Sequence, residues 1–225
     1  MVRIFDIVFS ILALTITSPF LLIIIFILKL TGENKVFYLQ ERIGKDRKIF
    51  KIYKFATMLE NSPNLETGSI TIKNDPRILP FGKFLRKTKI NELPQLINIL
   101  FGEMSIIGPR PLTPETFNMY SKKTQNVITQ VRPGLSGIGS IVFRAEENIL
   151  LDKEISQDFY TKVISPYKGL LEDWYIKNNK IYLYFLFIFL TLWLIFFPNS
   201  KIIWIILKKL PKPPDELKET LNFIS

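Results

Sequence analysis

Lys87-Thr-Lys-Ile-Asn-Glu-Leu-Pro-Gln-Leu-Ile-Asn-Ile-Leu-Phe-Gly-Glu-Met-Ser-Ile-Ile-Gly-Pro-Arg-Pro111 carries more information about this chain than any other segment. Apolar residues recur in it at helical spacing, at Leu93, Leu96, Ile97 and Leu100. This periodicity predicts a helix with one side facing a core. Pro94 suits the first turn of that helix, where a missing N–H costs nothing. The segment therefore predicts a short helix with Asn91 and Glu92 at its start and a stiff turn holding Arg110 after its end.

Asn91 and Glu92 suit two different roles at the start of a helix. Unpaired backbone N–H groups and the positive end of the helix dipole favour a bound phosphate there. A structural role fits as well, because asparagine is a good N-cap and a glutamate in the first turn complements the dipole. The residues taken alone favour the structural role. Arg110 lies between two prolines and can bind phosphate through two parallel hydrogen bonds.

The composition excludes several kinds of chemistry. The 225 residues include no cysteine and no histidine. This rules out a disulfide scaffold, a thiol nucleophile, a Ser-His triad and nearly every zinc site. Any metal would bind carboxylate oxygens, which favours Mg²⁺ or Mn²⁺. The net charge of +10 suits nucleic acid, anionic lipid or a polyphosphate substrate, and the 48% of hydrophobic residues favours a membrane protein.

The first apolar segment runs from Ile4 to Leu28 and allows two arrangements. About 20 apolar residues suffice for a transmembrane helix. Alternatively, Ser18-Pro19 breaks the segment into two arms, each too short to cross a bilayer core of about 30 Å. Nearby hydroxyls could then satisfy the freed backbone groups. The residues alone slightly favour the spanning helix. Basic residues that follow this segment place the next domain in the cytoplasm.

A second apolar run, Ile181 to Phe197, is slightly short for a span, and a further one covers residues 202–207. We expect helices lying in the membrane interface, with a second deep insertion as the alternative. Several lysines after residue 200 suit an anionic lipid surface. Residues 211–225 are rich in proline and charge and predict a peripheral tail.

The region between these segments predicts a small domain. Weak alternation from Lys35 to Tyr53 around a turn at residues 44–46 indicates a short hairpin or an extended connector. Residues 61–74 are polar and loop-like, and Pro80 to Lys87 forms an amphipathic helix whose apolar face rests either on a membrane or on a core. The predicted fold class is mainly α with a short β element. Its parts are an anchor at 1–34, a cytoplasmic domain at 35–180, membrane-associated helices at 181–210 and a tail at 211–225.

Several motifs occur in a fixed order along the chain. They are the Ser18-Pro19 break, Phe50-Lys-Ile-Tyr-Lys-Phe-Ala-Thr-Met58, Asp75-Pro-Arg77, Phe81-Gly-Lys-Phe-Leu-Arg-Lys87, Asn91-Glu-Leu-Pro-Gln-Leu96, Gly102-Glu-Met-Ser105, Gly108-Pro-Arg-Pro111 and Arg132-Pro-Gly134. In this order they resemble the bacterial sugar transferases, the monotopic phosphoglycosyl transferases. The resemblance covers residues 4–144, and more loosely the second apolar run. It reverses the preference at the first apolar segment, because the family has a re-entrant helix-break-helix there.

The resemblance implies an activity. Such enzymes transfer a sugar 1-phosphate from a UDP-sugar to polyprenyl (undecaprenyl) phosphate in the inner leaflet of the bacterial cytoplasmic membrane, which initiates lipid-linked glycan assembly. They use Mg²⁺ and an Asp-Glu pair whose aspartate forms a covalent phosphosugar intermediate. The resemblance argues against nucleic-acid binding. The sugar, the glycan pathway and the oligomeric state, including a homodimer, stay open.

The family's site residues map onto this chain one by one. Its glutamate is Glu92, expected to bind Mg²⁺ or to act as acid or base. The residues expected to contact substrate phosphate are Lys54, Arg77, Arg86, Arg110 and Arg132. Ser18 and Pro19 form the expected break in the membrane hairpin. Ala56 replaces an arginine that the family often has.

The family's aspartate is replaced by Asn91, and an amide is a poor nucleophile. Three hypotheses follow for Asn91. Glu92 could act as the nucleophile instead. Polyprenyl phosphate could attack directly, with Asn91 holding a phosphate oxygen. The chain could also bind lipid phosphate or nucleotide sugar without turnover, as a membrane-bound scaffold for glycan assembly. The intact arginines favour an enzyme.

Overall fold

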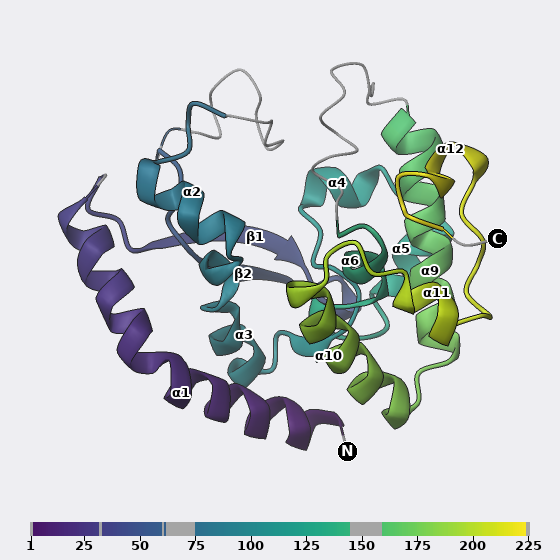
Figure 1. The fold of residues 1–225 in the computed structure, drawn as a ribbon, viewed down its shortest axis with the longest axis horizontal. Helices are drawn as coiled ribbons and strands as arrows, with labels where there is room; N and C mark the ends of the chain where they lie inside the picture. Colours follow the sequence, from purple (N-terminus) through teal and green to yellow (C-terminus); the bar gives the residue numbers. More distant parts are fainter. Residues whose placement is uncertain (1, 32, 60, 62–74, 145–158, 224–225) are drawn as a thin grey trace.

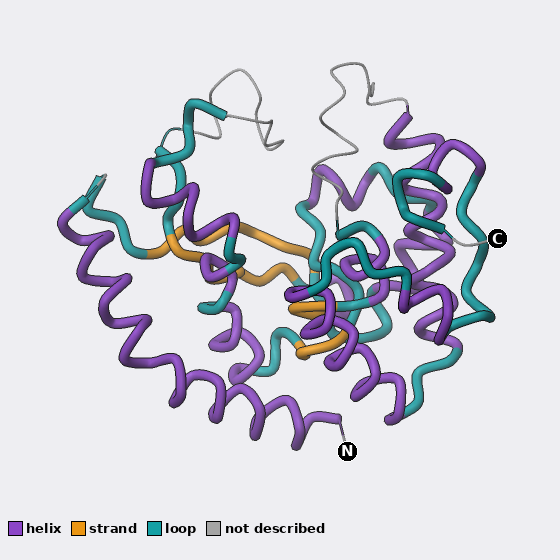
Figure 2. Tube along the Cα trace, viewed as in Figure 1, coloured by secondary structure: helices purple, strands orange, loops and turns teal. Residues whose placement is uncertain are grey.

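The computed structural model describes residues 2–31, 33–59, 61, 75–144 and 159–223. Helices dominate it, and two small sheets lie between them (Figure 2). This agrees with the predicted fold class, mainly α with a short β element. Of the loop expected at residues 61–74, residues 62–74 lie outside the described part of the chain.

The first helix, α1 (Val2–Leu30), differs from the expected pair of arms, because the chain stays helical through Ser18-Pro19. Figure 1 shows α1 as one bent helix that curves around the rest of the molecule. Pro19 has no N–H to offer the carbonyl of Thr15, four residues earlier. The Ser18 hydroxyl donates to that carbonyl instead, at 2.9 Å. The chain therefore continues through the proline with this carbonyl still hydrogen-bonded.

The predicted hairpin is present. Strands β1 (Phe37–Ile43) and β2 (Ile49–Phe55) pair antiparallel around the short 3₁₀ helix η1 (Lys45–Arg47), which confirms the turn expected there. The outer edge of β2 is held by the buried side chain of Asn98, which accepts from the Tyr53 N–H at 2.9 Å and donates to the Lys51 carbonyl at 2.8 Å. The hairpin is therefore fixed to the helix that carries Asn98.

The amphipathic helix is confirmed as α2 (Pro80–Lys87), and Leu85 on its apolar side is fully buried. A 3₁₀ turn, η3 (Ile90–Glu92), and helix α3 (Gln95–Phe101) follow. Leu96 and Ile99 are the buried apolar residues of α3, so its core-facing side is rotated slightly from the predicted one. Next along the chain come β3 (Ser105–Ile107), α4 (Pro114–Asn118), α5 (Lys122–Ile128), β4 (Gly134–Ser136) and α6 (Ile138–Val142). Strands β3 and β4 pair in parallel.

The C-terminal part shares the largest core cluster with β3, α6 and the start of α1. It contains a π-helical turn, η4 (Tyr160–Ile164), and helices α9 (Ser165–Lys177), α10 (Ile181–Phe196), α11 (Ile202–Ile206) and α12 (Asp215–Lys218). The second apolar run is therefore helical, as expected. The tail after residue 210 was expected to be peripheral, but Leu217 and Leu221 are buried in the largest core cluster. Two leucines four residues apart lie on one side of a helical turn, and that apolar side outweighs the surrounding charge.

Candidate active site

A small pocket lies where β1, β2, η3 and the turn after β3 meet. Its polar lining consists of Arg42, Lys54, Glu92, Gln95 and Arg110. Its apolar lining comes from Ile52, Pro111, Gly134 and Leu135. The pocket therefore holds one carboxylate among three cationic side chains, which gives it a positive balance suited to a polyphosphate.

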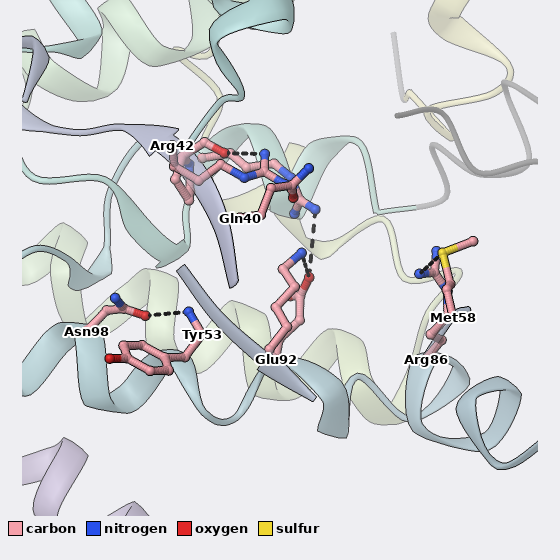
Figure 3. A network of polar contacts seen from close by, with 10 residues as sticks. Gln40, Arg42, Tyr53, Met58, Arg86, Glu92 and Asn98 are labelled. Carbon is pink, nitrogen blue, oxygen red and sulfur yellow. Dashed lines mark hydrogen bonds and ion pairs between the residues drawn. The ribbon is translucent and has the colours of Figure 1, made fainter. Parts of the chain in front are cut away.

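Glu92 is the centre of this arrangement. Its Oε1 lies 3.3 Å from Lys54 Nζ and 3.8 Å from Arg110 Nη2. Figure 3 shows the Glu92 carboxylate directed toward the side of the pocket where Arg42 and Gln40 lie. Burial alone would raise the pKa of Glu92, but Lys54, Arg110 and Lys89 outweigh it and lower the pKa to about 2. Glu92 is therefore ionised at neutral pH and shared between two cations.

Burial and mutual repulsion lower the pKa values of two cationic side chains in the pocket, Lys54 and Arg42. Burial lowers the pKa of Lys54 to about 8, and Arg110 and Arg42 contribute to this while Glu92 opposes it. Burial and the nearby Arg110 lower the pKa of Arg42 to about 10. The buried Nε of Arg42 has no hydrogen-bond partner among the described residues. An anion entering the pocket would relieve both the crowding of positive charge and the missing hydrogen bond.

The close backbone contact between Gly108 and Gly134 positions the turn that carries Arg110. Gly108 N–H donates to the Ser136 carbonyl at 2.9 Å, and Gly134 N–H donates to the Pro109 carbonyl at 2.8 Å. A Cβ on Gly134 would lie 2.1 Å from the Gly108 nitrogen, so only glycine allows this approach. The glycine-rich segment after residue 132 is thus a support for the turn that carries Arg110.

Asn91 lies beside Glu92 in η3 and is buried. Its Oδ1 is reached by no hydrogen-bond donor from the residues that the structure describes. A buried amide oxygen without a partner costs free energy and marks a position where a ligand can supply the missing contact. Asn91 and Glu92 therefore lie together just before α3, as the sequence predicts.

The other predicted phosphate-binding residues make structural contacts away from the pocket lining. Arg77 forms a buried ion pair with Asp75, with 2.6 Å between Nη2 and Oδ2. Arg86 Nη1 lies 3.9 Å from the Met58 sulfur (Figure 3). Arg132 Nε donates to the Gly102 carbonyl at the end of α3, at 2.8 Å. Of the predicted cations, the structure brings Lys54 and Arg110 together with Glu92.

Sequence reasoning missed Arg42 and Gln95 in the pocket. Arg42 donates to the Pro111 carbonyl at 2.9 Å and also to the Gln40 side chain. The alternation of β1 could have suggested Arg42, because Gln40 and Arg42 lie on one face of the hairpin. Its distance from Arg110 depends on the bridge between Ile43 and Leu112, which no local pattern reveals.

Among the described residues, the pocket offers a magnesium ion one carboxylate, that of Glu92. Across the described ranges, no three carboxylates gather closely enough to hold a metal ion. Protein Mg²⁺ sites commonly use one or two carboxylates and complete the shell with substrate phosphates and water. The two ion pairs of Glu92 both use Oε1. The residues present therefore fit a magnesium ion that arrives with a diphosphate.

The chain matches known proteins over most of its length. The family model described as "Bacterial sugar transferase" matches residues 1–198. The chain is 36% identical, over 84% of its length and 38% of the relative's, to "UDP-glucose:undecaprenyl-phosphate glucose-1-phosphate transferase" of Klebsiella pneumoniae. It is 34% identical, over 83% of its length and 41% of the relative's, to "UDP-N-acetylgalactosamine-undecaprenyl-phosphate N-acetylgalactosaminephosphotransferase" of Aeromonas hydrophila.

A third relative, "Exopolysaccharide production protein ExoY" of Sinorhizobium fredii, is 37% identical over 62% of this chain and 67% of its own. The chain thus spans well under half the length of several curated relatives that it matches and about two thirds of this shorter one. Because the family model covers most of the chain, the protein belongs to the bacterial sugar transferase family.

Proposed function

We propose that this protein transfers a sugar 1-phosphate from a UDP-sugar to undecaprenyl phosphate at the cytoplasmic face of the bacterial inner membrane, and so initiates a lipid-linked glycan. The observation that carries the proposal is the pocket in which Lys54, Arg42 and Arg110 surround Glu92. The names of several relatives share undecaprenyl phosphate but differ in the sugar, among them glucose, galactose and N-acetylgalactosamine. We therefore propose undecaprenyl phosphate as the acceptor, and the experiment below identifies the sugar.

The pocket residues suit phosphoryl transfer by positioning and charge neutralisation. Lys54, Arg42 and Arg110 hold the diphosphate, while Glu92 orients Lys54 and Arg110 and offsets their mutual repulsion. An oxygen of the lipid phosphate attacks the β-phosphorus of the UDP-sugar. The bond between that phosphorus and the bridging oxygen breaks, and UMP leaves. The products are a polyprenyl diphosphate sugar and UMP.

Direct attack by the lipid phosphate fits this pocket better than a covalent intermediate. A carboxylate with a pKa of about 2, paired with two cations, is a weak nucleophile, which argues against Glu92 in that role. Asn91 lies beside Glu92 but outside the pocket lining, and its unpartnered atom is the amide oxygen, so it offers a neutral side chain and no nucleophile there. A magnesium ion bound with the diphosphate would neutralise phosphoryl charge, and Glu92 is the residue that would hold it.

The membrane arrangement that we propose is re-entrant, with both ends of α1 on the cytoplasmic side. α1 is long and apolar enough to span a membrane by length and composition. However, Asp6 near one end contacts β3 and α10, and Ile24 near the other end lies in a core cluster with Phe55 of β2. A helix that crossed the bilayer would carry one of these ends away from the domain. We place α10 in the membrane interface beside α1, because Phe185 of α10 packs on Phe5 at 5.0 Å between ring centroids.

UMP release tests the proposal. The purified protein in nanodiscs is offered a panel of UDP-sugars with Mg²⁺, with and without undecaprenyl phosphate. Release of UMP that requires the lipid is the expected result and identifies the sugar. Absence of release with every sugar, from a protein that still binds UDP or the lipid, would contradict transfer.

A second candidate function rests on Asn91. An amide at the position of the family's aspartate fits a membrane-bound protein that binds lipid phosphate or nucleotide sugar as a scaffold without turnover. Asn91→Asp separates the two functions. If the native protein is a direct transferase, it turns over with sequential kinetics, and Asn91→Asp changes these to ping-pong kinetics with a trappable phosphosugar adduct. A native protein without turnover that gains it through Asn91→Asp would favour the scaffold.

A further inference from the structure

The first turns of α1 carry two charged residues whose partners lie in the domain. Asp6 is 1% exposed, although α1 presents apolar side chains along its outer face. Its Oδ1 accepts hydrogen bonds from Ser105 Oγ at 2.9 Å, the Ile106 N–H at 3.0 Å and the Tyr184 hydroxyl at 2.9 Å. A buried carboxylate is costly unless it is well hydrogen-bonded, and these three donors meet that requirement. Asp6 therefore ties α1 to β3 and α10.

Arg3, three residues earlier, holds a second element. It donates to the Leu100 carbonyl at 2.8 Å and also to the Ile99 carbonyl. These carbonyls belong to the last turn of α3. The residues four positions further along lie outside the helix, so their N–H groups do not form the usual helical hydrogen bonds with these carbonyls. A cation at a helix C-terminus also complements the dipole. Arg3 therefore ties α1 to the end of α3.

Both tethered elements lead to pocket residues at their other ends. Helix α3 begins three residues after Glu92, and β3 ends three residues before Arg110. Short, well-packed elements transmit position, because close packing leaves them little freedom to deform. Across the gap between these two elements, Glu92 Oε1 lies 3.8 Å from Arg110 Nη2.

We propose that Arg3 and Asp6 are positioning residues, through which the seating of α1 in the membrane sets the geometry of Glu92 and Arg110. The inference rests on the proposed function for its meaning, since those two side chains lie where the diphosphate would bind. It adds a dependence: the pocket reaches its binding geometry when the start of α1 lies against α3 and β3. Displacement of that part of α1 loosens the Arg110 turn before it affects the core behind it.

Hydrogen exchange tests this coupling without any substrate. Asp6→Asn keeps the size of the side chain and removes its charge. We expect faster amide exchange, by about tenfold, confined to residues 105–112 and 90–101, with little change in exchange around α9. Ser10→Ala is the matched control, because Ser10 is equally buried one turn further along α1 and its Oγ has no partner among the described residues. Uniformly faster exchange, or none, in Asp6→Asn would overturn the proposal.

A mutant cycle on UDP affinity gives a second readout. Asp6→Asn is expected to weaken UDP binding by about fivefold or more in the native background and by less than about twofold in Arg110→Lys, because the effect passes through Arg110. Equal losses in both backgrounds would show that Asp6 acts independently of Arg110. If Asp6→Asn does not fold, Ser105→Ala removes one of the three donors to Asp6 and is expected to show the same pattern more weakly. A native protein that binds no UDP would contradict the proposed function, and hydrogen exchange would still decide the positioning role.

Discussion

At the scale of single residues, Lys54 determines how the pocket responds to pH. Its pKa of about 8 means that the free protein loses this positive charge as the pH rises above 8. We expect kcat/KM, which reports the free enzyme, to be highest below pH 8 and to fall about tenfold per pH unit above it. Lys54→Arg should keep the charge and extend the plateau toward higher pH. Lys51→Arg, an exposed lysine on the same strand, is the control and should leave the profile unchanged.

The residue scale also shows how far the pocket could be predicted from the sequence. Asn91 and Glu92 could be placed, because helix periodicity and Pro94 fix where α3 begins. Arg77 looked equivalent to Arg110, yet it pairs with Asp75, two residues earlier. The Asp75-Pro-Arg77 sequence carries the partner of Arg77 within it, whereas nothing near Arg110 in the sequence indicates the pocket that it lines. The place of Arg110 in the pocket arises only when distant segments pack together.

At the scale of elements, the close contact between the turn after β3 and the start of β4 positions Arg110. A methyl group on Gly134 would lie 2.1 Å from the Gly108 nitrogen and 2.3 Å from the Ser136 carbonyl oxygen. These neighbours are backbone atoms, so the turn itself must move. Gly134→Ala should therefore lower kcat/KM by about tenfold or more and destabilise the protein by about 1–3 kcal/mol, measured by thermal unfolding. An unchanged kcat/KM in this variant would show that the contact between Gly134 and Gly108 does not position Arg110.

Gly44→Ala is the control for that substitution. Its nearest neighbours would be at 3.1 Å, and one of them is the side chain of Phe50, which can adjust. We expect a smaller loss of stability and little change in rate.

Elements with a strong local pattern were predicted correctly, and those defined by partners were not. The β1–β2 hairpin and α2 follow from alternation, a turn and an amphipathic period. The parallel pair β3–β4 joins residues 105–107 to 134–136, and a three-residue strand has no period of its own. The resemblance predicts a break at Ser18-Pro19, but the hydrogen bond from the Ser18 hydroxyl to the Thr15 carbonyl lets the helix continue, as the residues alone slightly favoured.

At the scale of the whole molecule, both halves of α1 pack on the same body, and this leads to a prediction about topology. The chain contains no cysteine, so single cysteines introduced at Val2 and Glu33 report the two ends of α1 cleanly. In spheroplasts of a bacterial expression host, a membrane-impermeant maleimide should label neither position, and both should react after lysis. Labelling of Val2→Cys from outside would show that α1 spans the bilayer. That outcome would also remove Asp6 and Arg3 from their partners in the domain, because a helix end on the outer side cannot reach β3 and α3. The labelling experiment and hydrogen exchange at residues 105–112 therefore both test the contact of the start of α1 with β3 and α3. A re-entrant α1 predicts protection of both cysteines in spheroplasts and faster exchange at residues 105–112 in Asp6→Asn.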